Sequence, residues 1–204
     1  MDNKQSKPRI PRQQRGIKTK KQITEAAMKL FSEKGFHSTN TKEIAQAAGI
    51  SIGCFYSYFE DKRTIFIEVL KLYFEQFNRI IISKISLLDP EQDNKKEFLK
   101  AVIKSILEAH QVFTNFHNEL IVMGFSDPFI GKMISEQEKA SKLYILDHLQ
   151  SWKDAVKTPD LEAASLVVFN SIHAVVDSII FTRSLDEERV INELVEMVSN
   201  YLFL

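Results

Sequence analysis

The residues with the clearest chemical potential lie between Asn40 and Lys62, in the segment NTKEIAQAAGISIGCFYSYFEDK. The spacing of its small apolar residues predicts a helix over residues 41–48. Gly49 can adopt a left-handed conformation at no steric cost, so it is predicted to form a turn. Ser51 then caps a second short helix by accepting a hydrogen bond from a free backbone N–H. This pattern predicts a helix-turn-helix, whose second helix fits the major groove of DNA, and the alternative is a plain helical hairpin.

The second helix of this motif has side chains for two different environments. Phe55 and Phe59 are four residues apart and face one way, toward the interior. The other faces carry Ser51, Ile52, Cys54, Ser57 and Tyr58. Ile52 lies in the first turn, where side chains reach base edges, and its available partner there is the methyl group of thymine. The alternative for Ile52 is packing inside the domain.

The charges are distributed unevenly along the 204 residues, although the formal net charge is zero. Residues 1–63 contain 13 Lys/Arg and 6 Asp/Glu, a charge of +7, whereas residues 64–204 contain 14 and 21, a charge of −7. A basic N-terminal part on an acidic remainder is typical of a DNA-binding domain joined to a part that does not bind DNA. We therefore expect a DNA-binding domain over residues 1–63, with a basic arm over residues 1–15, and a second domain over residues 64–204.

Helical periodicity continues along the whole chain, and no strand-like alternation of useful length occurs. The sequence predicts an all-α fold of about nine helices. Besides the two helices of the motif, a first helix is expected over residues 18–34, and Gly35 ends it. Further helices are expected over residues 61–88 and 95–116, in a segment ending near 124–125, and over residues 128–153. The last two begin near 158, with Thr158 as cap and Pro159 at the first position, and near 186, with Asp186 or Ser184 as cap. Asp61 is expected to cap the fourth helix, and Asp89-Pro90 to end it.

The eighth helix has apolar residues on more than one face, which is more than burial against a single neighbour requires. Such a surplus face is typical of an interface, and two helices from each of two copies can form a four-helix bundle. We therefore expect a homodimer through the last two helices. Its predicted interface residues are Leu161, Val168, Ile172, Val175, Ile179, Ile191, Val195 and Val198.

The N-terminal region resembles the signature of the TetR family of bacterial transcriptional regulators over about residues 16–70, without a gap. The matching positions are Gly35-Phe36, Thr39, Ile44-Ala45, Ala48-Gly49, Ser51, Gly53, Phe55-Tyr56, Tyr58-Phe59 and Lys62. The resemblance implies phosphate contacts from Thr39, Tyr56, Tyr58 and Lys62. The sequence departs from the family at two positions, because Ile52 replaces a common Lys or Arg and Cys54 replaces a common Thr or Ser. Cys54 is interpreted as a small unreactive residue, with a redox switch as the alternative.

Aromatic side chains are concentrated in the C-terminal part, and the resemblance implies a ligand cavity there, between helices. The alternative for each of these residues is ordinary core packing. A small hydrophobic or amphipathic ligand is expected, with Glu119, Asn170 and His173 as candidate polar groups. The predicted pocket residues are Phe74, Phe77, Phe113, Phe116, Met123, Phe125, Phe129, Phe169 and His173.

Signatures of other protein classes are absent from the sequence. His110 and His117 lie seven apart on one helix face, but no tight cluster of metal ligands accompanies them, so no metal site and no cofactor are expected. There is no phosphate-binding loop or nucleophile elbow, which disfavours an enzyme. One cysteine and no signal peptide favour the cytoplasm, and apolar stretches broken by polar residues disfavour a membrane partner. The predicted function is a ligand-released repressor of a palindromic operator in double-stranded DNA. The alternatives are a DNA-binding regulator controlled by a protein partner, a helical enzyme, and a protein that binds membrane surfaces through its basic arm.

Overall fold

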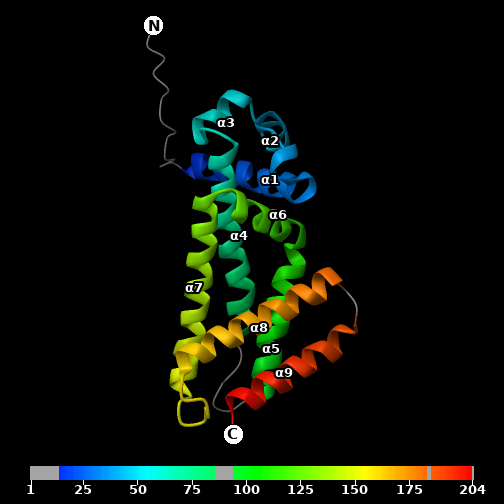
Figure 1. The fold of residues 1–204 in the computed structure, drawn as a ribbon. Coiled ribbons are helices and arrows are strands. Elements are labelled where there is room, and N and C mark those ends of the chain that lie inside the picture. The colour runs from blue at the N-terminus through cyan, green and yellow to red at the C-terminus, as the bar shows by residue number, and fades with distance from the viewer. Residues whose placement is uncertain (1–13, 86–93, 183–184, 204) are drawn as a thin grey trace. The chain divides into compact units, whose positions relative to one another are not determined.

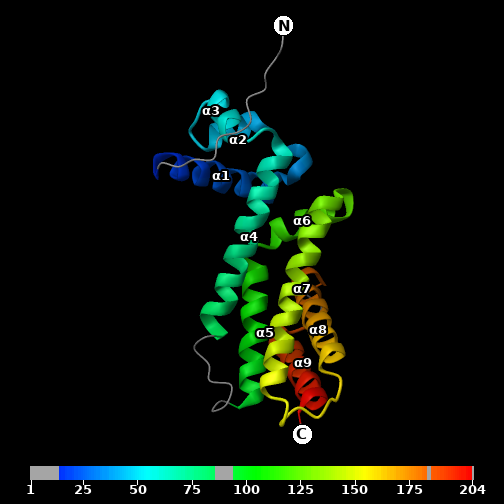
Figure 2. The same ribbon diagram turned by 90° about the vertical axis from the view of Figure 1, so that its left-hand side faces the viewer.

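The computed structural model describes residues 14–85, 94–182 and 185–203, and within these ranges it contains nine helices and no β-strand (Figures 1 and 2). The all-α fold with about nine helices is thereby confirmed. In chain order the helices are α1 (Gln14–Ser38), α2 (Thr41–Ala47), α3 (Ile52–Tyr58), α4 (Lys62–Ile85), α5 (Lys95–Val112), α6 (Thr114–Ser126), α7 (Pro128–Ser151), α8 (Leu161–Thr182) and α9 (Glu187–Leu202).

The chain forms two compact units that do not follow the predicted boundary at residue 63. The first unit contains the described residues up to Glu75 together with Asn115–Ser126, so it includes most of α6. The second contains the described residues of 76–114 and 127–204. The boundary moves because the first half of α4 and α6 share an aromatic core with α1. The Phe66 ring lies 5.3 Å from that of Phe31 in α1 and 5.6 Å from that of Phe116 in α6.

Most of the predicted helix starts are confirmed by their capping hydrogen bonds. Ser51 accepts from the Cys54 amide, and Asp61 accepts from the amide of Thr64. Asp127 caps α7 with Pro128 at its first position, and Asp186 caps α9. These starts were predictable because a polar side chain next to free N–H groups stabilises a helix without help from distant residues.

Two helix boundaries differ from the predictions. α8 begins at Leu161 rather than near Thr158, because the carboxylate of Asp160 accepts from the Ala163 amide at 2.9 Å. α5 ends at Val112 rather than near residue 116, and α6 follows from Thr114. The basic arm and the Asp89-Pro90 break lie in or mostly in segments outside the described residues.

The core of the second unit joins α5, α7, α8 and α9, and α8 and α9 lie side by side in it (Figure 1). Lys100 and Lys104 of α5 both bind Glu188 of α9, at 2.6 and 2.8 Å. Their hydrogen bonds, that of Lys100 first, lower the pKa of Glu188 to about 2. Contacts of this kind fix the first turn of α9 against α5.

The residues predicted for the dimer interface differ in burial within the chain, and the interface itself stays a prediction. Val168, Ile172, Ile191, Val195 and Val198 belong to the buried core of the second unit, and Leu161, Val175 and Ile179 pack against it. The helices α5, α7, α8 and α9 pack against one another here, so the side chains of α8 and α9 that belong to this core are buried within their own chain. Other apolar side chains of α8 and α9 are exposed.

α8 carries apolar side chains on both its buried and its exposed sides. Among the described residues, α8 is the one helix that is long and apolar enough to cross a membrane by length and composition, whereas no such helix was expected from the sequence. The same properties are found in core helices of soluble proteins, and its inward-facing side chains pack in the core of the second unit. We therefore interpret α8 as a core helix with a further apolar face.

Candidate nucleic-acid interface

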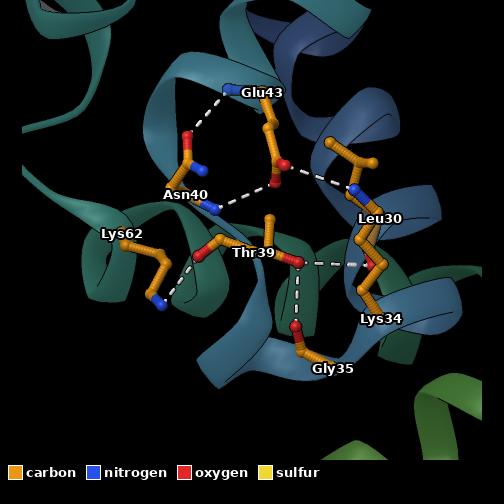
Figure 3. Close-up of polar contacts among 7 residues, drawn as sticks. All are labelled: Leu30, Lys34, Gly35, Thr39, Asn40, Glu43 and Lys62. Carbon is orange, nitrogen blue, oxygen red and sulfur yellow. Dashed lines mark hydrogen bonds and ion pairs between the residues drawn. The ribbon is translucent and has the colours of Figure 1, made fainter.

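The helix-turn-helix of the first unit is built from α2, a glycine turn and α3. Asn40 and Glu43 form a capping box at the start of α2, in which each side chain accepts from the other residue's backbone N–H (Figure 3). Gly49 has a φ of 67°, which confirms the left-handed turn. Phe55 and Phe59 are 0% and 2% exposed, so they anchor α3 in the core. These local devices fix the direction of α3 relative to α2.

The side of α3 opposite its two buried phenylalanines is open to solvent. Ile52 is 37% exposed and Tyr56 50%, while Cys54 and Tyr58 are half-buried. The first unit therefore does not bury Ile52, and its side chain is available to a partner. A Cβ added at Gly53 would meet no atom within 4 Å, so nothing within the chain requires glycine there. This opening at Gly53, which sequence reasoning missed, lets another molecule approach the backbone closely.

Hydroxyl groups on this side of the motif are already oriented by hydrogen bonds. The Ser51 side chain caps α3, and the Ser57 hydroxyl donates to the Cys54 carbonyl at 2.6 Å. The Tyr56 hydroxyl lies 3.2 Å from the Thr41 hydroxyl at the start of α2. Thr41 was not predicted from the sequence, because its side chain reaches Tyr56 only through the packing of α2 against α3. Paired hydroxyls of this kind can donate to a phosphate oxygen.

Thr39 is buried, with 1% of its surface exposed. Its hydroxyl donates to the carbonyl of Gly35 at 2.8 Å and contacts that of Leu30 at 3.4 Å (Figure 3). The side chain thus satisfies carbonyl groups at the end of α1. This geometry contradicts the phosphate contact predicted for Thr39, because a buried hydroxyl engaged in this way does not reach DNA.

Lys62 is also engaged by the backbone of its own unit. Its ammonium donates to the carbonyls of Phe36 at 2.6 Å and Thr39 at 2.8 Å, and lies 4.4 Å from the centroid of the Phe36 ring. Burial lowers the pKa of Lys62, and the nearby charge of Glu119 opposes this change. These bonds join α4 to the turn at the end of α1, and the phosphate contact of Lys62 stays a prediction.

The second unit contains a separate group of aromatic and titratable side chains from α4, α5 and α8. The rings of Phe77 and His110 are 4.9 Å apart, and those of His110 and His173 are 5.6 Å apart. Phe169 lies 4.2 Å from His173. The Nδ1 atom of His110 is 4.0 Å from Oδ1 of Asp177, and His110 is 2% exposed. We call these five residues the histidine cluster.

Models of known families match both parts of the chain. The model described as "Bacterial regulatory proteins, tetR family" matches residues 23–69. The model described as "Tetracyclin repressor-like, C-terminal domain" matches residues 77–196. The chain belongs to the TetR family. Its members are transcriptional regulators with a helix-turn-helix that binds DNA.

Individual relatives and structures agree with this assignment. The chain is 38% identical over 89 residues to an uncharacterised HTH-type transcriptional regulator, YuxN, of Bacillus subtilis, covering 43% of this chain and 30% of that protein. A TetR-family regulator from Mesorhizobium loti has the same fold, with a TM-score of 0.79 and 24% identity over 94% of this chain and all of that one. A complex of SmeT with triclosan superposes with a TM-score of 0.70 and 16% identity, over 92% of each chain.

The pocket residues expected for this TetR-family chain do not form one group. Phe77, Phe169 and His173 belong to the histidine cluster. Phe113, which directly follows α5, is half-buried. Phe116, Met123 and Phe74 lie in the first unit, where the Phe116 ring packs 5.3 Å from Tyr73. The remaining expectations are wrong, because these side chains are exposed: Phe125 at 92%, Phe129 at 51%, and Asn170. Glu119 is bonded to the Phe36 amide of the first unit instead.

Side chains that could bind a metal ion occur in both units. In the second unit His110 and Asp177 offer one nitrogen and one carboxylate oxygen near each other. In the first unit Nδ1 of His117 is 3.2 Å from the Tyr73 hydroxyl. The expectation that this TetR-family chain holds no metal ion remains a prediction.

Replacing Thr39 with Val should lower the free energy of unfolding by ~1–3 kcal/mol, because buried carbonyl groups lose their donor. Chemical denaturation of the full chain measures this change. Thr41→Val is the matched control: it removes a hydroxyl next to Tyr56, and should weaken DNA binding with little effect on stability. A Thr39→Val protein as stable as the wild type but weaker on DNA would restore the phosphate contact to Thr39.

Proposed function

We propose that this chain is a transcriptional repressor that binds a palindromic operator as a homodimer and is released from it by a small molecule. The observation that carries the proposal is the exposed side of α3, held at a fixed angle by a capped helix and a left-handed glycine turn. A recognition helix of this kind reads base edges from its first turns in the major groove. DNA as the partner also favours the cytoplasm as its location.

The distribution of charge supports the same partner. The basic excess of +7 in residues 1–63 provides the attraction to phosphates, and the acidic excess lies in the rest of the chain. Each Lys or Arg that neutralises a phosphate releases a condensed counterion. Tyr56 and Thr41 add hydroxyl donors that can fix the register of the domain on the backbone.

The first test is selection of binding sites from random double-stranded DNA with the purified full chain. We expect enrichment of an inverted repeat, because two recognition helices related by a two-fold axis read the same half-site twice. Affinity for the selected site should fall steeply with salt concentration, as counterion release requires. Recovery of unrelated sequences, or affinity independent of salt, would contradict operator binding.

The selected site also tests Ile52. Replacing half-site thymines individually with uracil removes only the methyl group, so a loss of affinity at one position identifies an apolar contact. The loss should disappear in the Ile52→Ala protein. Sensitivity that persists in that variant would assign the methyl contact to another residue.

The homodimer is proposed to form through a stripe on α8 that faces solvent. Ala163, Val167, Asn170, Ala174, Ser178 and Phe181 recur three or four residues apart, and all are exposed. Met197 of the neighbouring α9 is 51% exposed. Small residues in the middle of the stripe allow two helices to approach closely, and the apolar ones supply surface to bury. A contact of this face with its own copy forms a four-helix bundle with two-fold symmetry.

Val167→Asp should shift the protein from dimer to monomer, because it places a charge at the centre of the contact. Sedimentation should then give a mass near 23.6 kDa at micromolar concentration. Val112→Asp is the matched control, since Val112 of α5 is 59% exposed and lies outside the stripe. A Val167→Asp protein that remains a dimer would show that another surface joins the copies.

The histidine cluster is the proposed site of the releasing ligand. Three rings from α5 and α8 and a fourth from α4 supply apolar faces, while His110 and Asp177 supply polar atoms at 4.0 Å from each other. Such a mixture suits a small amphipathic molecule, whose apolar part packs on the rings and whose polar group hydrogen-bonds. SmeT, a neighbour in fold, forms a complex with triclosan, which supports a small molecule as the ligand of a similar helical scaffold.

A thermal-shift screen of amphipathic compounds tests the ligand. We expect hits that raise the melting temperature and also release the selected operator. His110→Phe should abolish the response to such hits and preserve DNA binding, since the ring is kept and the nitrogen atoms are lost. His148→Phe is the control, because His148 packs near Trp152 and Phe98 instead. If no compound does both, control by a protein partner becomes the better proposal.

A further inference from the structure

The turn at the end of α1, from Gly35 to Thr39, is held by Thr39 itself and by groups from two further helices of the first unit, α4 and α6. Gly35 has a φ of 80° there, so the backbone leaves the helical path and its peptide groups need other partners. The carbonyl of Gly35 accepts from the Thr39 hydroxyl (Figure 3). The carbonyl of Phe36 accepts from the Lys62 ammonium. The Phe36 N–H donates to Oε1 of Glu119 in α6 at 2.6 Å. Phe36 is therefore held by α4 at its carbonyl and by α6 at its amide.

The carboxylate of Glu119 fits closely against this turn. A Cβ built on Gly35 would lie 2.9 Å from Oε2 and 3.5 Å from Cδ of Glu119, so any larger residue would displace the carboxylate. Its positive φ is what favours glycine at position 35, and a larger residue there would in addition shift the Glu119 carboxylate. The negative charge of Glu119 also acts on Lys62, which holds the other side of Phe36.

The position of Glu119 in the chain gives this contact a wider consequence. Asn115–Ser126 belongs to the first unit, whereas the helices before and after it, α5 and α7, belong to the second. α6 is therefore joined covalently to the second unit at both of its ends. A change in the second unit that moves α6 acts directly on the Glu119 carboxylate.

We propose that Glu119 is a positioning residue for DNA binding: its bond to the Phe36 amide sets the α1–α2 turn, and couples α2 and α3 to the state of α6. This inference rests on the proposed function, since it concerns regulation of the same interface. The bond is charge-assisted, and such bonds are shorter and stronger than those between neutral groups. Because coupling is reciprocal, DNA bound to α3 must also affect α6.

Hydrogen exchange of the full chain tests the bond without any ligand. In Glu119→Ala and Glu119→Asp the Phe36 amide should exchange roughly tenfold faster, because the acceptor is lost or withdrawn by one methylene. Glu119→Gln keeps an acceptor at the same distance and should restore part of the protection. Asn118→Ala is the control, since Asn118 is an exposed neighbour on α6.

Operator binding tests the coupling. With the selected site, the Kd of Glu119→Ala should rise roughly tenfold, the loss of about one such bond. Operator DNA should slow exchange in residues 115–126 of the wild type, and this effect should vanish in Glu119→Ala and Glu119→Asp. A structural defect alone would lower the melting temperature without removing the link between DNA and α6.

The outcomes separate this inference from the proposed function. If the wild-type chain selects no inverted repeat, operator binding fails, and the exchange of Phe36 still reports whether Glu119 holds the turn. If the wild type binds its operator and both Glu119 variants keep the same Kd and the same protection of α6, the inference is wrong. Should Glu119→Ala not fold, Glu119→Asp provides the same comparison with the charge retained.

Discussion

The arrangement of the DNA-binding unit depends on satisfying the backbone where α1 ends. A helix end leaves carbonyl groups without partners, and the left-handed residue Gly35 adds an amide that points away from the helix. Thr39, Lys62 and Glu119 provide the missing partners from three separate parts of the chain. The same bonds that satisfy this turn also join α2, α4 and α6 to α1. The hydrogen bonds that satisfy the backbone at this turn therefore also hold the helices of the unit together.

Features of the structure that depend on neighbouring residues were predictable from the sequence. Ser51, Asp61, Asp127 and Asp186 each precede a helix and bond to an amide within three residues, so their roles follow from local spacing. The start of α8 was misplaced for the same kind of reason. Thr158 and Pro159 form a good start pattern, but Asp160, next in line, is the residue that accepts from the helix.

Features that depend on distant contacts were not predictable in this way. Thr39 and Lys62 carry donors typical of phosphate contacts, and only the folded structure shows that these donors bond to backbone carbonyls of their own unit. Phe125 resembles a pocket residue by type, yet it is 92% exposed. Periodicity states that a residue is apolar and on a given side of its helix, and it does not state what lies opposite that side.

α8 shows why apolar composition alone does not locate an interface. The side chains of α8 fall into three groups on different sides of the helix. Val168 and Ile172 enter the core, Val167 and Ala174 face solvent, and His173 and Asp177 join the histidine cluster. Burial on the first side makes the helix stable, so the composition of the other sides is free to serve association and ligand binding. A dimer contact on the second side and a ligand on the third would then act on the same rigid element, which needs no flexible connection between them. Under the proposed function, α8 would be one element through which a ligand in the second unit changes the spacing of two recognition helices.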